Sequence, residues 1–230
     1  MSNKFRNGAD KPVVALDIDG TLGDYHGHFL RFAEGYIGRE MPPANIINPG
    51  LPLWKHMRVS RNTYRACKLA YRQGGLKRSM PAYPFASELT RKLRRAGAEV
   101  WICTTRPYLR LDNIDPDTRE WLRRNRIQYD AVIFGEAKYR ELVRQVGIHR
   151  VVAVADDLPE QIGNAKQIGI SHIYLMDQPY NQPQIFLDNS RNPVFMPHDR
   201  LGPIQRVHNL KELWEDLAPV VKEARKELAA

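Results

Sequence analysis

The chain has 230 residues, a formal charge of +9, a pI of about 9.6 and 43% hydrophobic residues, which excludes a disordered protein. No apolar run approaches the roughly 20 residues that span a bilayer, and residues 1–11 lack the apolar stretch of a signal peptide. Two cysteines are too few for a disulfide framework, so we expect a cytoplasmic protein that does not enter membranes. The basic charge favours anionic partners such as phosphorylated metabolites, nucleotides or nucleic acid.

Five short apolar runs predict buried parallel strands, at residues 13–16, 100–103, 131–134, 151–155 and 172–176. Between them, amphipathic stretches predict helices at residues 85–96, 115–122, 138–146 and 159–168. Three of these helices run up to a glycine, which is the usual residue just beyond a helix C-terminus. Since strands and helices alternate, we predict an α/β fold with a doubly wound parallel sheet.

The gap between the first and second predicted strands is too long for a single crossover. Residues 28–37 and 60–73 have helical patterns, so we predict a small helical cap inserted after the first strand. The cap would occupy residues 24–84, and the core residues 1–23 and 85–230. In the core, residues 177–205 are rich in Pro, Asn and Gln and are expected to wrap the surface. A last helix is predicted at residues 210–228, broken or kinked at Pro219.

The strongest chemical signal is the segment Asp17-Ile18-Asp19-Gly20-Thr21-Leu22, directly after the first strand. Two carboxylates two residues apart can share one metal-bound site if the chain turns there, and Gly20 supplies the freedom to turn. One acid is then placed to attack phosphorus, and the other to donate and recover a proton. The alternative is a surface turn rich in Asp and Gly.

Three further signals follow later strands. The pair Asp156-Asp157 ends the fourth strand, where buried acids are costly without a cation; a helix N-cap pair is the alternative. The segment Thr104-Thr105-Arg106 ends the second strand and predicts an anion cradle, although threonine is common at strand ends. Lys138 begins a helix after the third strand, as either a cation that neutralises phosphate or a solvated lysine. All four signals lie at the carboxyl edge of the sheet, so we expect them to act together.

With these motifs in this order, the chain resembles the haloacid dehalogenase superfamily of phosphohydrolases over about residues 13–176. The resemblance implies that Asp17 is the nucleophile and forms an aspartyl-phosphate, while Asp19 protonates the leaving oxygen and then activates water. It implies Mg²⁺ as the cofactor, held by Asp17, the backbone carbonyl of Asp19 and an acid of the Asp156-Asp157 pair. The spacing to Gly169-Ile170 favours Asp157 as the direct ligand, with Asp156 in support.

The same resemblance implies that Thr104 binds the phosphoryl group and that Lys138 neutralises both this group and the nucleophile. Thr105, Arg106 and Gly20 join Thr104 as candidate phosphate-binding residues. An Asp rather than Ser or Ala at position 19 argues for a phosphatase over a dehalogenase. We therefore predict a phosphoric monoester hydrolase.

A narrower resemblance is to the 5′(3′)-deoxyribonucleotidases. It rests on residues 17–30, on Ile102-Cys103-Thr104-Thr105-Arg106-Pro107, on Asp177-Gln178-Pro179-Tyr180-Asn181, and on Arg206-Val207 before Leu213-Trp214. The resemblance implies a nucleoside monophosphate as substrate, bound under the helical cap. The cap itself departs from that family, because Trp54, Tyr64 and Tyr71 match its aromatic pocket only loosely and residues 74–78 are basic.

Positive charge in the cap and in the helix that follows it leaves the identity of the substrate open. Between Lys55 and Arg95 there are twelve basic residues against one acid. In one interpretation the cap closes over a single nucleotide, and the enzyme hydrolyses (deoxy)nucleoside monophosphates. In another, the basic cap binds a nucleic-acid strand, and the enzyme removes a terminal 3′-phosphate. The match at residues 177–181 favours the mononucleotide.

A third interpretation is a non-catalytic, basic nucleic-acid-binding protein, and the intact acids at positions 17, 19 and 157 argue against it. Within the predicted helix 60–73, Tyr64, Cys67 and Tyr71 share a face that favours packing over base stacking. Another face partly carries arginines that suit a phosphate or polyanion: Arg58, Arg61, Arg65 and Arg72. The oligomeric state is left open, a homodimer included.

Overall fold

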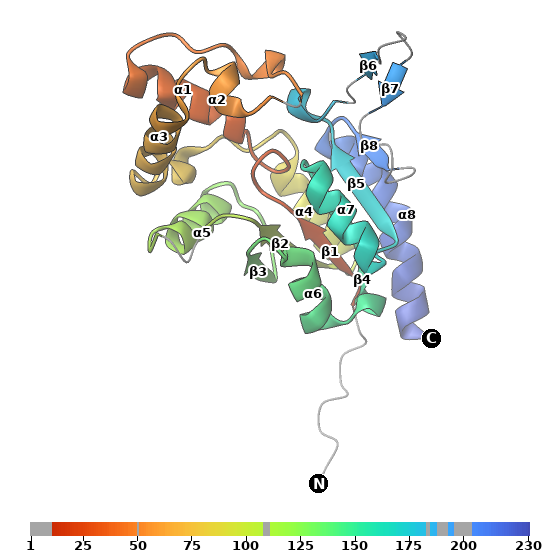
Figure 1. Cartoon of the computed structure of the whole chain (residues 1–230). Coiled ribbons are helices and arrows are strands. Elements are labelled where there is room, and N and C mark those ends of the chain that lie inside the picture. The colour runs from red at the N-terminus through yellow and green to blue at the C-terminus, as the bar shows by residue number, and fades with distance from the viewer. Residues whose placement is uncertain (1–10, 50, 108–110, 183–184, 188–192, 196–203) are drawn as a thin grey trace.

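A six-stranded parallel sheet forms the centre of the computed structural model, which describes residues 11–49, 51–107, 111–182, 185–187, 193–195 and 204–230 (Figure 1). The strands lie in the order β3-β2-β1-β4-β5-β8. Their bounds are β1 (Val13–Leu16), β2 (Glu99–Thr104), β3 (Ala131–Phe134), β4 (Val151–Asp156), β5 (His172–Met176) and β8 (Gln205–Val207). All neighbouring strands pair in parallel, so the predicted α/β fold is confirmed.

Helices cover both faces of the sheet: α4 (Ala86–Arg95), α5 (Ile114–Arg124) and α8 (Leu210–Ala229) pack on one side, and α6 (Lys138–Val146) and α7 (Pro159–Ile168) on the other. The side chains of β1 alternate between these layers. Val14 and Leu16 join the apolar cluster of the first side, whereas Val13 and Ala15 join that of the second. Because both faces are buried, the strand is apolar at every position.

The predicted cap is formed after β1 by α1 (Tyr25–Ile37), α2 (Leu53–His56) and α3 (Arg61–Gln73), with short 3₁₀ helices at Ala44–Ile46 and Leu76–Ser79 (Figure 1). The cap has a small core of its own, in which Phe29, Cys67 and Tyr71 are fully buried. The helix α1 begins three residues before its predicted start. Its N-terminus is capped by Asp24, whose carboxylate accepts a hydrogen bond from the backbone N–H of Gly27 at 2.8 Å.

The C-terminal helix α8 runs unbroken through Pro219, so the predicted break is wrong. Proline removes one backbone hydrogen bond from a helix. Leu217 and Val221, on either side of it, are fully buried in the described structure, and this packing keeps the helix continuous. None of the helices in the described ranges is long and apolar enough to cross a membrane.

The segment 177–205 is only partly described. Its described part contains a 3₁₀ turn at Pro179–Asn181 and an antiparallel pair, β6 (Ile185–Leu187) with β7 (Pro193–Phe195). The expectation that this segment wraps the surface concerns mostly residues outside the described ranges. The strand β8, which adds a sixth strand beside β5, has only three residues and gives too short a pattern to predict.

Trp121 packs against both segments that connect the core to the cap. Its indole Nε1 donates a hydrogen bond to the backbone carbonyl of Met80 at 2.6 Å, and its side chain is fully buried. Met80 lies where the chain returns from the cap. Gly23 lies where the chain enters the cap, and a Cβ atom added there would be only 2.9 Å from the Trp121 ring.

We expect Trp121→Phe to lower the free energy of unfolding by about 2 kcal/mol or more, since it leaves a small cavity and a buried carbonyl without its donor. Urea denaturation measures this change. Trp214→Phe is the matched control, because the Trp214 side chain is only half-buried. Equal losses in the two variants would contradict the role given to Trp121.

Candidate active site

The carboxyl edge of the sheet brings the predicted site residues together. Asp17 follows β1, Thr104 ends β2 and Asp156 ends β4. The strand register puts Leu16 level with Ile102 on one side and with Ala155 on the other, so the next residues of the three strands lie side by side. The site therefore sits where β1 separates the two halves of the sheet, which is the usual ligand position in open α/β folds.

Lys138, the first residue of α6, is buried against two of these acids. Its Nζ lies 2.6 Å from Asp17 Oδ1 and 2.6 Å from Asp156 Oδ2. Burial alone would lower the pKa of Lys138, but Asp156 and Asp17 outweigh burial and raise the pKa above its ordinary range. Lys138 is therefore a permanent cation, and the alternative of a solvated lysine is excluded.

Asp156 has a full set of partners within the protein. One oxygen, Oδ2, accepts a hydrogen bond from the Tyr139 hydroxyl at 2.7 Å in addition to the contact with Lys138. The other, Oδ1, accepts a hydrogen bond from the backbone N–H of Leu158 at 2.9 Å, in the turn that precedes α7. These contacts orient Asp156 and leave it little capacity for a further ligand.

Only one of the two carboxylate oxygens of Asp157 has a hydrogen-bond partner. Its Oδ2 accepts a hydrogen bond from the Tyr180 hydroxyl at 2.5 Å, whereas its Oδ1 is buried without a hydrogen-bond partner. Burial, followed by repulsion from Asp156 and Asp17, raises the pKa of Asp157 well above its ordinary value. Oxygen atoms of Asp17, Asp156 and Asp157 lie within 4.8 Å of one another. Clustered carboxylate oxygens with one unpartnered atom fit a hard divalent cation such as Mg²⁺.

Asp19 lies between two buried cations. Arg106 Nη2 donates to Asp19 Oδ1 at 2.6 Å, and Lys77 Nζ contacts Asp19 Oδ2. Burial opposes ionisation, but Arg106 and Lys77 outweigh it and hold the pKa of Asp19 below its ordinary range. Arg106 is oriented by the Thr118 hydroxyl, which accepts from its Nη1 at 3.1 Å. Lys77 comes from the cap, so Asp19 joins the cap to the core.

Some of these side chains line one cavity of about 230 Å³ between the core and the cap. The core wall includes the three acids Asp17, Asp19 and Asp157. The cap wall includes aromatic and basic side chains: Tyr25, His26, Tyr64, Lys68, Arg72 and Lys77. Thr105 and Arg106 line the cavity, whereas Thr104 is buried and its hydroxyl oxygen is 3.4 Å from the backbone N–H of Arg106.

Several residues at this centre escaped prediction as site residues, among them Tyr180 and Lys77. Tyr180 was singled out only within a matching tail segment, and Lys77 only within a basic segment of the cap. Their contacts with Asp157 and Asp19 bridge 23 and 58 positions of the chain, respectively. No local spacing reveals such contacts, although a basic residue in the cap is a weak signal for the second.

The turn at Gly20 has no room for a side chain. Its φ is +91°, which favours glycine, and a Cβ atom added there would collide with Asp157 Oδ2 and the Tyr180 hydroxyl. Its carbonyl accepts a hydrogen bond from Gln178 Nε2 at 2.7 Å, so the tail segment also holds this turn. Gly20 is thus a spacer that lets the first motif and Asp157 approach each other.

The profile of one protein family, described as 5′ nucleotidase, deoxy (pyrimidine), cytosolic type C protein, matches residues 11–192. The chain belongs to this nucleotidase family. It is therefore a phosphatase of the haloacid dehalogenase superfamily, as the sequence motifs indicate. A comparison with curated proteins finds no significant match.

Solved structures of this superfamily share the fold at low sequence identity. A haloacid dehalogenase-like hydrolase from Streptococcus pneumoniae is 14% identical with a TM-score of 0.57, over 90% of this chain and 99% of that one. A family hydrolase from Deinococcus radiodurans, solved with bound phosphate and sodium, is 15% identical with a TM-score of 0.59, over 93% and 97%. A subfamily IA hydrolase from Geobacter sulfurreducens is 16% identical with a TM-score of 0.52, over 90% and 99%.

In this nucleotidase-family chain, we expect divalent-cation binding to strengthen as the pH rises through neutrality. Burial, only partly offset by Lys138, raises the pKa of Asp17 from 3.8 to about 7. At pH values between these two pKa values, Asp17 of the metal-free folded protein retains a proton that the unfolded chain has lost. The free energy of unfolding of the metal-free protein therefore falls as the pH rises. A cation must displace this proton, so binding is weak at low pH and strong above the folded-state pKa.

The rise in melting temperature on adding Mg²⁺ to chelator-treated protein measures this effect. We expect a larger rise at about pH 8 than at about pH 5.5. Asp157→Asn should abolish the rise, whereas the control Asp112→Asn, at an exposed position, should keep it. Equal rises at the two pH values would contradict the assignment to these acids.

We expect Gly20→Ala to reduce kcat/KM at least about 100-fold, because it displaces Asp157 from the first motif. The matched control is Gly35→Ala, on an exposed turn of α1 where a Cβ atom meets nothing within 4 Å. That change should leave activity intact and stabilise the helix by up to about 1 kcal/mol. Phosphate release and thermal unfolding of both variants measure the difference, and a fully active Gly20→Ala protein would exclude the proposed spacing role.

Proposed function

We propose that the chain is a Mg²⁺-dependent phosphomonoesterase that hydrolyses (deoxy)nucleoside monophosphates through an aspartyl-phosphate on Asp17. The observation that carries this proposal is the arrangement in one cavity of Asp17, Asp19 and Asp157 beneath a cap, with Lys138 held against Asp17. Membership in the nucleotidase family supports the nucleotide substrate, and the word cytosolic in the family's description supports a cytoplasmic location.

In the first step, an oxygen of the Asp17 carboxylate attacks phosphorus and the bond from phosphorus to the ester oxygen breaks. Asp19 donates a proton to that oxygen, and the nucleoside leaves as an alcohol. Asp19 must carry a proton for this step. A phosphate dianion in the cavity competes with Asp19 for Lys77 and Arg106, the two cations that keep this acid ionised.

In the second step, water attacks the phosphorus of the aspartyl-phosphate while the Asp19 carboxylate accepts its proton. Inorganic phosphate leaves, and Asp17 returns as a free carboxylate. The ionised state in which Arg106 and Lys77 hold Asp19 suits this proton transfer. Asp19 thus acts first as acid and then as base on the same side of the reacting group.

The cation site fits Mg²⁺, with Asp17, Asp157 and the backbone carbonyl of Asp19 as the proposed ligands. The unpartnered Oδ1 of Asp157 supports this choice over Asp156, whose oxygens are already engaged. When bound, Mg²⁺ would favour the ionised form of Asp17 and offset the charge of the phosphoryl oxygens. Lys138 adds a fixed positive charge beside the nucleophile.

Thr104, Thr105, Arg106 and the turn at Gly20 are the proposed phosphate-binding residues. Thr105 and Arg106 line the cavity next to the acids, which supports their part in this proposal. The nucleoside would lie against the cap wall. There Tyr25 and Tyr64 line the cavity, and burial lowers the pKa of His26 to about 4, so this ring is neutral at physiological pH.

We expect Asp17→Asn to reduce kcat at least about 10³-fold, by removing the nucleophile. The fold should survive, because the change removes a charge that burial disfavours and Lys138 keeps its contact with Asp156. Phosphate release and circular dichroism measure the two effects, with the exposed Asp112→Asn as control. Undiminished turnover in the Asp17→Asn protein would contradict the mechanism.

A substrate panel separates the proposed function from removal of a terminal 3′-phosphate from nucleic acid. Phosphate release is measured for nucleoside and deoxynucleoside 5′- and 3′-monophosphates, a sugar phosphate and a 3′-phosphorylated oligonucleotide. The proposal predicts the highest kcat/KM for a mononucleotide. Hydrolysis of the oligonucleotide alone would overturn it.

A further inference from the structure

Two cations on the cap wall of the cavity have no carboxylate partner. Lys68 and Arg72 lie one helical turn apart on α3 and line the same cavity as Asp17. Among the described residues, neither forms an ion pair, and Arg72 Nε is buried without a hydrogen-bond acceptor. Lys68 Nζ lies 5.4 Å from the centroid of the Tyr64 ring.

The other cations around the cavity are already engaged. Lys138 contacts Asp17 and Asp156, while Lys77 and Arg106 share Asp19. Burial, with repulsion from Arg72, lowers the pKa of Lys68 to about 8, so these two cations lie close enough to destabilise each other. Two neighbouring and partly buried positive charges are costly unless an anion binds between them.

The position of this pair on the cap distinguishes it from the centre that receives the transferred phosphoryl group. That centre is built on the core, from Asp17, Asp157 and Lys138. Lys68 and Arg72 come from α3, on the opposite wall, next to the aromatic side chain of Tyr64. A ligand that fills the cavity from wall to wall therefore meets the acids of the core at one end and these two cations of the cap at the other.

We propose that Lys68 and Arg72 form a subsite for a second phosphate on the substrate, so that the preferred substrates are nucleosides with two separate phosphates. This inference rests on the proposed function and names the substrate class of the same site. The charge-assisted hydrogen bonds of a guanidinium and an ammonium group suit a phosphate, which offers several acceptor oxygens.

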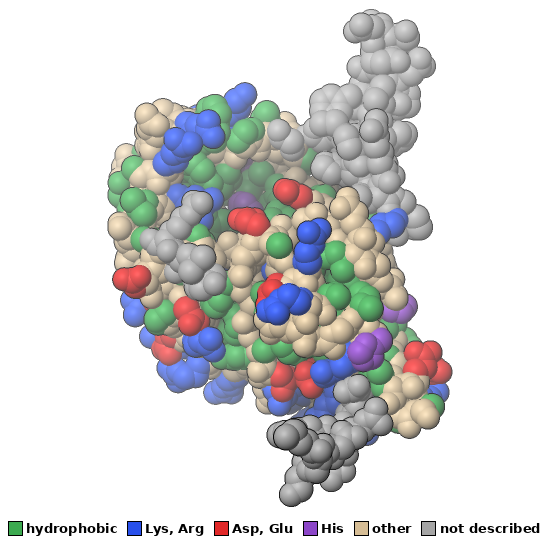
Figure 2. Space-filling view, turned by 60° about the horizontal axis from the view of Figure 1, so that its bottom comes forward, with side chains coloured by type: hydrophobic (Ala, Val, Ile, Leu, Met, Phe, Trp, Pro, Cys, Tyr) green, Lys and Arg blue, Asp and Glu red, His purple; other side chains and the backbone are tan. Residues whose placement is uncertain are grey.

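The size of the cavity favours a mononucleotide over a nucleic-acid strand. Its volume of about 230 Å³ is slightly below the usual range for sites of drug-sized ligands. On the face that Figure 2 shows, Lys and Arg side chains are interspersed with acidic, apolar and other side chains and form no continuous basic track across it. A strand bound along its backbone would need such a track.

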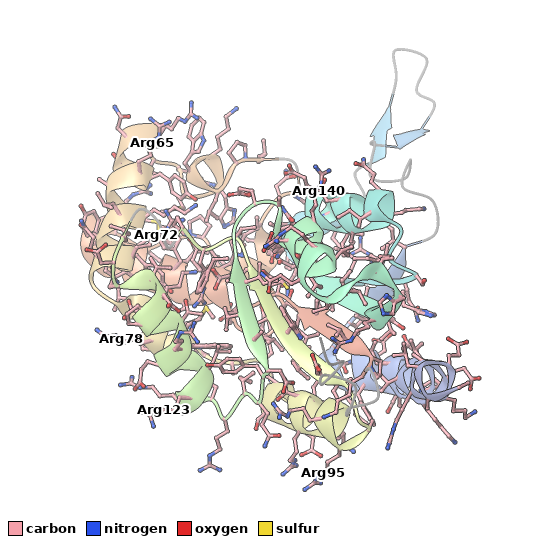
Figure 3. All side chains as sticks on the ribbon, turned by 90° about the horizontal axis from the view of Figure 1, so that it is seen from below. Arg65, Arg72, Arg78, Arg95, Arg123 and Arg140 are labelled. Atoms are coloured by element: carbon pink, nitrogen blue, oxygen red, sulfur yellow. The ribbon has the colours of Figure 1, made fainter. Side chains whose placement is uncertain are left out.

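Three exposed arginines, Arg65, Arg95 and Arg123, lie away from this cavity. Figure 3 shows Arg65 at the outer side of the cap and Arg95 and Arg123 at the rim of the core. All three are exposed, and none lines the cavity. Arg65 lies on the same helix as Arg72 and carries the same charge, so it provides a matched control for the proposed subsite.

The decisive measurement is kcat/KM with Mg²⁺ for a deoxynucleoside 3′,5′-bisphosphate and for the 5′- and 3′-monophosphates of the same base. We expect kcat/KM for the bisphosphate to exceed that for the better monophosphate at least about tenfold, because one additional charge-assisted hydrogen bond has an effect of this size. Lys68→Met and Arg72→Met should each remove this preference, mainly through KM for the bisphosphate. Arg65→Met should retain it, and thermal unfolding verifies that all variants fold.

Three results would overturn the subsite: equal kcat/KM values in the wild type, retention of the preference in both Lys68→Met and Arg72→Met, or an equal loss in Arg65→Met. A 3′-phosphorylated dinucleotide, whose second phosphate is a diester, distinguishes the source of that phosphate. If kcat/KM for this dinucleotide exceeds that for the bisphosphate, the subsite binds the end of a nucleic-acid strand and the assignment of a mononucleotide substrate is wrong.

Binding to the Asp17→Asn protein separates this inference from the proposed function. Calorimetry should show the bisphosphate binding at least about tenfold more tightly than the monophosphates, even if the wild type hydrolyses none of them. Tight binding without turnover would count against the proposed function and support the subsite. Equal affinities would count against the subsite whatever the enzyme hydrolyses.

Discussion

The buried ammonium group of Lys138 is the interaction on which the carboxyl edge of this sheet depends. It contacts Asp17 and Asp156, and Asp157 lies in the same cluster within 4.8 Å. Burial and repulsion from neighbouring acids disfavour the ionised forms of Asp17 and Asp157, so the cluster needs compensating positive charge. Lys138 supplies part of it, and the unpartnered oxygen of Asp157 leaves a place for a divalent cation to supply the rest.

The cap adds a second set of charges from the other side. Asp19 is shared between Arg106 of the core and Lys77 of the cap, so the acid to which the proposal gives the proton transfers also connects the two parts of the fold. In the proposal, a substrate anion enters a cavity in which Lys77 and Arg106 are already paired with Asp19, whereas Lys68 and Arg72 form no ion pair within the described residues. In the proposed mechanism, the substrate anion therefore replaces Asp19 as the ionic partner of some cations. The cations that have no ionic partner beforehand indicate where a further negative charge of the substrate would bind.

Much of the fold was predictable because the signals are local. Apolar runs such as residues 13–16 predicted the strands, and the glycines after residues 146 and 168 predicted the helix ends. The fold class and the family are confirmed. A break or a kink at Pro219 was predicted from the same local rules, and the break is wrong, because burial of Leu217 and Val221 outweighs the loss of one hydrogen bond. The roles assigned to the site residues remain predictions.

The sequence by itself determined which acids and cations stand at strand ends. A parallel sheet then carries Asp17, Thr104 and Asp156 to one edge, whatever the details of packing. Only the tertiary structure decided which residues approach them from elsewhere. Tyr180 reaches Asp157 from the tail, and Lys77 reaches Asp19 from the cap across 58 positions. These contacts depend on how the cap and the tail pack against the core, which is a property of buried surfaces far apart in the chain and leaves no periodic pattern in the sequence.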